Sequence, residues 1–221
     1  MAEDASTPLP RTIAILGGTG PQGRGLARRL ALAGFDVAVG SRSAQRARET
    51  AAAIGPDLTG GTNAEVVAGA DVVIVAVPWD GHAELLKSLA GELAGKVVVD
   101  CVNPLGFDKQ GPYALDVPEG SAAQQAAALL PDSLVTAAFH HVSAELLEDE
   151  AIATCDVDVL VLGDDRHATD VVQGIAARIP GMRGIYAGRL RNARQVEALT
   201  ANLIAINRRY KTHAGIRVTD V

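Results

Sequence analysis

The chain has 221 residues, of which 48% are hydrophobic and 3% aromatic, and its formal net charge is −6. This length suits one domain with at most a small appendage, and the negative charge argues against a nucleic-acid ligand. No apolar run approaches the roughly 18 residues that span a bilayer, and Cys101 and Cys155 are too isolated for a disulfide framework or a metal site. We therefore predict no membrane insertion, no bound metal and a cytoplasmic location.

The first predicted unit is strand, glycine turn, helix, strand. An apolar run from Ile13 to Leu16 enters the turn, a segment of helical periodicity follows, and a second apolar run spans Phe35 to Val39. In the spacing G-x-G-x-x-G, the first glycine makes the turn, the second lets the backbone approach a pyrophosphate, and the third lets helix and strand pack closely. We therefore predict dinucleotide binding, with a purely structural turn as the alternative. The predicted contacts are Gly18, Thr19, Gly20, Gln22 and Gly23.

The end of the second strand indicates which dinucleotide binds. A site that prefers NAD has an acidic residue there to accept a hydrogen bond from the ribose 2′-OH. This chain has Ser41-Arg42, followed by Arg46 one helical turn later. A hydroxyl and two guanidiniums match a 2′-phosphate in charge and geometry, so we predict NADP. The alternative is that these arginines are surface residues at an exposed helix start and bind no ligand.

Strand and helix patterns alternate along the rest of the chain, as in α/β folds. We predict strands at 58–62, 71–77, 96–100, 134–138, 157–162 and 184–187, and helices at 44–54, 64–68 (capped by Asn63), 81–93, 121–130, 144–150, 166–178 and 193–210, with a loop at 105–120. The predicted fold is α/β, a doubly wound, mostly parallel Rossmann sheet with a small C-terminal α/β extension. We assign residues 11–155 to the dinucleotide-binding domain and 156–221 to a small domain that contributes to the substrate site and to a dimer interface.

The carboxyl ends of parallel strands are where ligands of open α/β sheets bind. Three such ends carry Val77-Pro78-Trp79, Asn103 and His140-His141. Trp79 can line a nicotinamide or substrate pocket, or serve only in packing. At least one histidine is expected to act in the site, although core and capping histidines are common.

The chain lacks a familiar proton donor for carbonyl reduction. Such a dehydrogenase needs a donor beside the hydride acceptor, for example a Tyr-x-x-x-Lys pair, and Tyr113, Tyr186 and Tyr210 lie in no such motif. An acceptor that is itself a redox cofactor requires only that two rings be aligned and water excluded. The sequence favours this second case.

Positive charge is concentrated near the C-terminus. Nine basic residues and one acidic residue lie between Arg178 and Arg217. This segment is either a solvated basic face or a rim that attracts an anionic substrate.

Four segments together resemble the NADPH-dependent F420 reductases, also called F420:NADP oxidoreductases. They are GGTGPQGRGLARRLALAGFDVAVGSR (residues 17–42), VPW (77–79), AFHHVSA (138–144) and RNARQVEALTANLIAIN (191–207). The resemblance extends over nearly the whole chain from Thr12. It implies hydride exchange between C4 of the NADP nicotinamide and C5 of the deazaflavin coenzyme F420, with no metal and no covalent intermediate. We also predict that the protein is a homodimer.

The resemblance also implies residue roles. It places Thr19, Ser41, Arg42 and Arg46 at the NADP 2′-phosphate. It places His140, Val142, Arg194 and Thr200 around the nicotinamide and the deazaflavin. Ala198 and Ser143 depart from members that have serine and proline there.

Two other functions are compatible with the same turn. One is an NADP-dependent reductase of another small substrate, including a relative of the metal reductases. The other is a protein that senses NADP without turnover.

Overall fold

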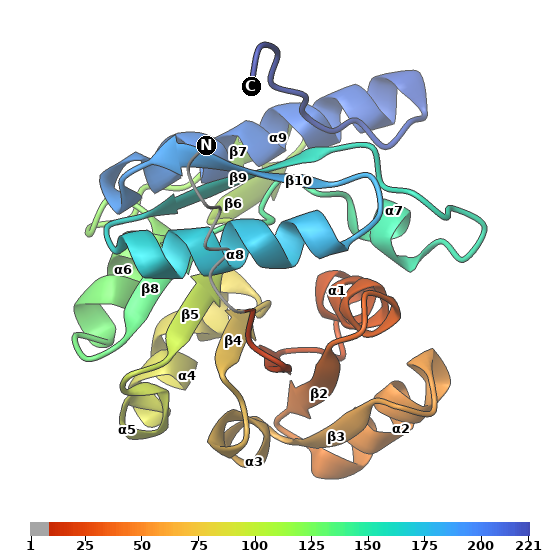
Figure 1. Ribbon diagram of the computed structural model, residues 1–221. Coiled ribbons are helices and arrows are strands. Elements are labelled where there is room, and N and C mark those ends of the chain that lie inside the picture. The colour runs from red at the N-terminus through yellow and green to blue at the C-terminus, as the bar shows by residue number, and fades with distance from the viewer. Residues whose placement is uncertain (1–8) are drawn as a thin grey trace, which may run out of the picture.

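The computed structural model describes residues 9–221, which form an eight-stranded sheet with helices on both faces (Figure 1). The strand order is β10-β9-β8-β5-β4-β1-β2-β3. The strands of this sheet are β1 (Thr12–Leu16), β2 (Asp36–Ser41), β3 (Thr59–Thr62), β4 (Val72–Val75), β5 (Val97–Asp100), β8 (Leu134–Ala137), β9 (Asp158–Gly163) and β10 (Arg183–Gly188). Neighbouring strands are parallel, apart from the antiparallel pair β8 and β9. The predicted doubly wound, mostly parallel sheet is confirmed.

Helices cover the two faces of the sheet over separate apolar layers. The helices are α1 (Pro21–Leu32), α2 (Ala44–Ile54), α3 (Asn63–Ala68), α4 (His82–Ser88), α5 (Ala90–Leu93), α6 (Ala122–Leu129), α7 (Ala144–Glu148), α8 (Arg166–Arg178) and α9 (Ala193–Tyr210). One layer packs α1, α2, α7 and α8 against the sheet, and the other packs α3 to α6 and α9. All residues of β4 and β5 are buried, which is why these central strands are continuous apolar runs.

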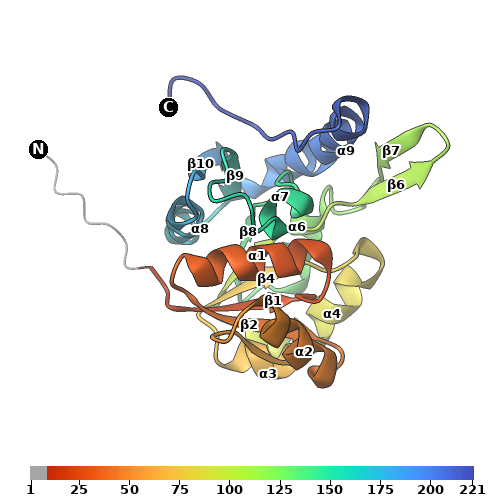
Figure 2. The same ribbon diagram turned by 90° about the vertical axis from the view of Figure 1, so that its right-hand side faces the viewer.

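The segment between Leu105 and Gly120 differs from its prediction as a loop. It contains an antiparallel hairpin of β6 (Leu105–Asp108) and β7 (Gly111–Ala114) that projects from the body of the molecule (Figure 2). Its turn is closed by the Asp108 carboxylate, which accepts hydrogen bonds from the amides of Gln110 and Gly111. Gly111 has a φ of +120°, which favours glycine.

Two smaller predictions were also wrong. The single helix predicted over 81–93 is divided at Leu89 into α4 and α5 and follows a 3₁₀ turn, η1 (Trp79–Gly81). The cap of α3 is Thr62 rather than Asn63, because Thr62 and Glu65 form a reciprocal capping box. This motif stabilises a helix start by pairing two otherwise free amides.

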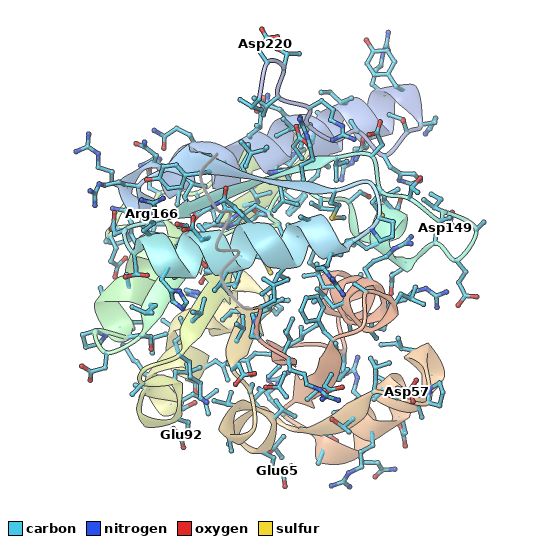
Figure 3. The ribbon with its side chains drawn as sticks, in the orientation of Figure 1. Asp57, Glu65, Glu92, Asp149, Arg166 and Asp220 are labelled. Atoms are coloured by element: carbon cyan, nitrogen blue, oxygen red, sulfur yellow. The ribbon has the colours of Figure 1, made fainter. Side chains whose placement is uncertain are left out.

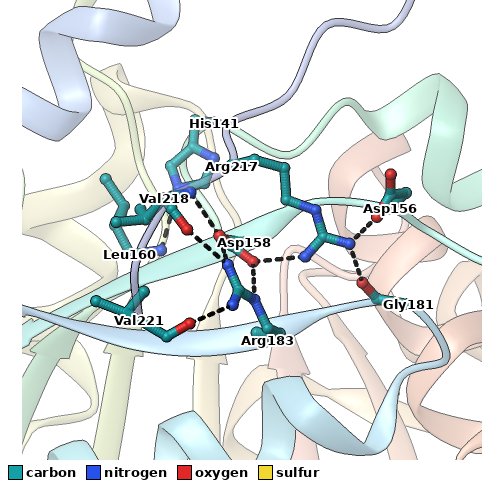
Figure 4. A network of polar contacts seen from close by, with 9 residues as sticks. All are labelled: His141, Asp156, Asp158, Leu160, Gly181, Arg183, Arg217, Val218 and Val221. Atoms are coloured by element: carbon teal, nitrogen blue, oxygen red, sulfur yellow. Dashed lines mark hydrogen bonds and ion pairs between the residues drawn. The ribbon is translucent and has the colours of Figure 1, made fainter.

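The C-terminal segment is tied to the sheet through Asp158, the first residue of β9 (Figure 4). Its buried carboxylate accepts hydrogen bonds from Arg183, Arg217 and the amide of Val218. The guanidinium of Arg183 holds the pKa of Asp158 below its usual value. The strand pair β8–β9 and this network both join residues 156–221 to the sheet.

Charged side chains cover the outer surface, as the labelled Glu65, Glu92 and Arg166 illustrate (Figure 3). Within residues 9–221, none of the helices has the length and apolarity to cross a membrane. The same part of the chain contains no group of three or more histidine, cysteine or acidic side chains arranged to hold a metal ion.

Candidate functional site

The glycine turn leaves β1 in a left-handed conformation at Gly17. The φ of Gly17 is +70°, and a Cβ at this position would lie 2.6 Å from the carbonyl oxygen of Ala76. Gly18 is also confined, since its Cβ would lie 2.9 Å from the carbonyl oxygen of Ile15. The residue that needs positive φ is therefore Gly17, one position before the G-x-G-x-x-G spacing, and the sequence analysis missed it.

The other two glycines of the motif differ in what surrounds them. A Cβ at Gly23 would lie 2.6 Å from the Cα of Gly18, so α1 starts in direct contact with the turn. A Cβ at Gly20 would meet nothing closer than 3.5 Å, so the space in front of this residue is open. No side chain among the described residues caps α1, and Pro21 occupies its first turn. An uncapped helix start beside open space is suited to bind a phosphate.

The end of β2 adjoins this turn. The amide of Gly18 donates to the carbonyl of Gly40, and Ser41, the last residue of β2, is almost buried. Arg42 and Arg46 are exposed, and neither forms an ion pair with another residue in 9–221. Two unpaired guanidiniums are thus available for an anion beside the turn.

A cleft of about 580 Å³ lies where α1, the end of β8 and α9 meet. Gln22, Asn103, His140, Val142 and Thr200 contribute to its walls. The C-terminal half of α9 and the segment after it complete the cleft with Arg208, Lys211 and His213. Five of the predicted site residues are therefore brought together in one place.

His140 is one of the residues that line the cleft. Its side chain is 3% exposed, and neither ring nitrogen has a hydrogen-bond partner among the described residues. Burial lowers the pKa of His140 to about 4, so its ring is neutral at physiological pH. A neutral imidazole offers one N–H donor and one acceptor, and no other described residue uses either of them.

His141 is used differently. Its Nε2 accepts a hydrogen bond from the amide of Leu160, which fixes the end of β8 against β9. Burial lowers its pKa to about 4. The two histidines therefore differ: His141 is hydrogen-bonded to β9, whereas neither ring nitrogen of His140 has a partner among the described residues.

Three elements meet at the main-chain carbonyl of His140. The side-chain amide of Asn103 donates to it at 2.9 Å and the hydroxyl of Thr200 at 3.1 Å. Asn103 follows β5 and Thr200 lies on α9. This carbonyl therefore couples the ends of β5 and β8 to the last helix.

The residue before His140 has an unusual backbone. Phe139 has a φ of +63°, a conformation that costs a non-glycine residue about 1–3 kcal/mol. Its carbonyl accepts a hydrogen bond from Gln22 of α1 at 3.2 Å. Backbone strain of this kind occurs preferentially at functional sites.

The remaining predicted residues do not line the cleft. Val77 packs under the turn, where its Cγ1 would be 2.7 Å from a Cβ on Gly17. Pro78 is exposed, and the Trp79 ring packs against His82 with centroids 5.5 Å apart. Arg194, in the first turn of α9, forms an ion pair with Asp116 at 2.7 Å.

The sequence of this chain is similar to those of known proteins. Residues 12–104 match the family described as NADP oxidoreductase, coenzyme F420-dependent. F420-dependent NADP reductase from Methanothermobacter thermautotrophicus is 39% identical, over 95% of this chain and 95% of that protein. The same enzyme from Methanocaldococcus jannaschii is 38% identical, over 95% and 98%. The chain belongs to the F420-dependent NADP reductase family.

A solved structure agrees with this assignment. A protein from Arthrobacter sp. FB24, described as a candidate F420-dependent NADP reductase, superimposes with a TM-score of 0.80 and 26% identity. The match covers 95% of this chain and 99% of that one. The match therefore covers nearly the whole chain and not only residues 12–104.

Next to the cleft of this family member lies a buried polar cluster that the sequence analysis missed. His82, Asp100 and Glu197 are each at most 3% exposed. They come from α4, β5 and α9, and His82 Nε2 lies 2.6 Å from Asp100 Oδ2. Asp100 is three residues before Asn103 and Glu197 is three residues before Thr200. The sequence offered one signal for this cluster, namely charged side chains that lie within apolar stretches.

Proposed function

We propose that this chain transfers a hydride reversibly between NADP(H) and the deazaflavin coenzyme F420. The observation that carries the proposal is the cleft in which Gln22, at the uncapped start of α1, lies with His140, Asn103 and Thr200. Its relatives at 38–40% identity are named F420-dependent NADP reductases.

The NADP half of the proposed site extends from the turn to the end of β2. The main chain at Gly18, Gly20 and Gly23 suits a pyrophosphate, because a side chain at Gly20 would occupy the open space in front of the uncapped helix. Residues at the end of β2 and in the turn would hold the 2′-phosphate, and residues at the next strand ends would hold the nicotinamide. The first set is Thr19, Ser41, Arg42 and Arg46; the second is Gln22, Val77, Pro78, Trp79, Asn103 and Val142.

When bound, the two ring systems would supply the redox chemistry, since each can give or accept a hydride. The chain then needs to align the rings and exclude water. His140, neutral and buried, offers a hydrogen-bond donor without adding charge to the site. Thr200 and Arg194, both on α9, are proposed to contact the deazaflavin.

We also propose how the chain is organised. Residues 11–155 would act as the dinucleotide-binding domain, and residues 156–221 would supply α9 and the C-terminal wall of the cleft. A homodimer is supported by exposed aromatic side chains on the projecting hairpin, Phe107 and Tyr113, which are 61% and 48% exposed. A cytoplasmic location is supported by two free, buried thiols, Cys101 and Cys155.

The decisive experiment mixes the protein with F420 and NADPH and follows the deazaflavin absorbance, with NADH as the control. We expect bleaching with NADPH, recovery of absorbance when reduced F420 is mixed with NADP, and much slower reaction with NADH. Tight NADPH binding without bleaching in either direction would refute hydride transfer to F420 and favour the sensing alternative. Oxidation of NADPH by imines or metal ions in place of F420 would favour another reductase.

A further inference from the structure

Glu197 joins α9 to the start of α6. Its carboxylate accepts hydrogen bonds from the amides of Ala122 at 2.9 Å and Ala123 at 3.1 Å, the first two residues of α6. The third amide of α6, that of Gln124, is capped locally by Ser121. Glu197 is 3% exposed, so this carboxylate takes the place of solvent or a local cap at a helix start.

Behind this contact lies the pair of His82 and Asp100. The two ring nitrogens of His82 face acceptor oxygens, Asp100 Oδ2 at 2.6 Å and Gln125 Oε1 at 3.0 Å. Gln125 is oriented by donating its amide N–H to Glu119. Burial alone would lower the pKa of His82, but the Asp100 carboxylate and these hydrogen bonds raise it overall. Because both ring nitrogens face acceptor oxygens, the surroundings of His82 suit a ring that donates from both nitrogens.

This cluster fixes elements that carry proposed site residues. The other oxygen of Asp100 accepts a hydrogen bond from the amide of Val102, which holds the segment that leads to Asn103. Glu197 lies between Arg194 and Thr200 on α9. Arg194, Glu197 and Thr200 lie within two turns of the same helix. A displacement of α9 at Glu197 therefore moves Arg194 and Thr200 with it.

We propose that Glu197 is a positioning residue for hydride transfer: by holding α9 on the first amides of α6, it sets where Thr200 and Arg194 meet the deazaflavin. This inference rests on the function proposed above. The role is indirect, because Glu197 is buried and does not line the cleft.

The ionised carboxylate is the form that both amides require. Burial raises the pKa of Glu197 to about 7, and the amides of Ala122 and Ala123 oppose that rise. The groups that face Glu197 are Asp100 from β5, which also raises the pKa of Glu197, and Ser121 before α6, which lowers it. Glu197 also acts electrostatically on His82 from α4. Protonation turns one oxygen into a donor and weakens the contact with α6.

The test compares the full-length wild type with Glu197→Gln and Glu197→Asp, using Gln195→Ala, an exposed position on the same helix, as the matched control. Glutamine keeps the size of the side chain but replaces one acceptor by an N–H₂ group, so it can satisfy only one amide. We expect kcat/KM for F420 to fall about 10- to 100-fold in Glu197→Gln. The Kd for NADPH without F420 should stay within about twofold, because its proposed contacts lie on other elements.

A pH profile separates positioning from a general loss of structure. In the wild type, kcat/KM for F420 should rise with pH through an apparent pKa of about 7 and reach its plateau in the ionised form. Glu197→Gln should lack this step, whereas Glu197→Asp, which keeps an ionisable group, should retain a step. A titration that belongs to the ligands would appear in all variants and is thereby distinguished.

The outcomes are separable. An active wild type with unchanged F420 kinetics in Glu197→Gln would overturn the positioning role, and so would parallel losses of NADPH affinity and F420 turnover that track a lowered Tm. If Glu197→Gln does not fold, the same comparison is made with Glu197→Asp: F420 kinetics equal to wild type would overturn the role, and a selective F420 defect would support it. A wild type that does not reduce F420 would instead refute the proposed function itself.

Discussion

Replacing Arg29 should weaken the contact between α1 and α7, two helices whose residues contribute to the walls of the cleft. Arg29 lies on α1 and is 4% exposed. Its guanidinium donates to four main-chain carbonyls at the end of α7 and just beyond it, those of Leu146 and Leu147 at 2.9 Å, Asp149 at 2.9 Å and Ile152 at 2.6 Å. One side chain thereby satisfies the C-terminal end of α7.

The magnitude follows from the number of acceptors left unpaired. A buried carbonyl that loses its donor costs about 1–3 kcal/mol. In Arg29→Met, the Asp149 carbonyl keeps the amide of Ile152 as a donor. We assume that water reaches one of the other three carbonyls and that two remain dry, so the free energy of unfolding should fall by about 2–6 kcal/mol. Arg29→Lys keeps the charge but concentrates its donors on one atom, so it cannot span four carbonyls and should recover only part of the loss.

Urea unfolding monitored by circular dichroism measures this loss. Arg28→Met is the matched control, because Arg28 lies on the same helix and its ion pair joins a side chain that is 21% exposed to Glu150, which is 77% exposed. An ion pair with a solvent-exposed partner contributes about 0–1 kcal/mol, so the control should change little. A loss below about 1 kcal/mol in Arg29→Met, or equal losses in the two variants, would refute the capping role of Arg29.

Three further changes test the site and the C-terminal segment. Replacing Arg42 and Arg46 together by alanine should raise the NADPH KM about 10- to 100-fold with little change for NADH; equal changes for both cofactors would contradict the 2′-phosphate assignment. Thr200→Val removes the hydroxyl that bonds the His140 carbonyl and should lower kcat/KM for F420 about 5- to 10-fold, a result checked by stopped-flow absorbance. Asp158→Asn should lower the free energy of unfolding by about 2–4 kcal/mol at pH 7. Because the folded-state pKa of Asp158 is lowered, its stabilisation is present above the ordinary pKa of about 4 and is lost as the pH falls through the folded-state value; a difference from wild type that persists at low pH would contradict this.

Much of the fold could be predicted because its signals are local. The helices predicted at 44–54, 166–178 and 193–210 coincide with α2, α8 and α9. The starts of α2 and α8 have side-chain caps from Ser43 and Asp165, which lie in the sequence next to the helices that they cap. The apolar runs of β4 and β5 follow from burial on both faces.

The contacts around the cleft could not be predicted in the same way. Glu197 bonds to amides about 75 positions away, and Arg29 bonds to carbonyls about 120 positions away. Neither partner is distinguished by residue type, since every residue has a carbonyl and nearly every residue an amide. A pattern search can flag a charged residue in an apolar stretch, but it does not indicate which main-chain atom satisfies that charge.

The same reasoning explains why the histidine motif did not distinguish between its two members. What organises this edge of the cleft is the main chain of Phe139 and His140, whose carbonyls receive Gln22 from α1, Asn103 after β5 and Thr200 from α9. The left-handed φ of Phe139 costs about 1–3 kcal/mol, and these three donors offset that cost by about 1 kcal/mol each. Contacts from α1, the end of β5 and α9 therefore together stabilise the strained turn. The geometry around His140 thus depends on the complete fold and not on the sequence motif that contains it.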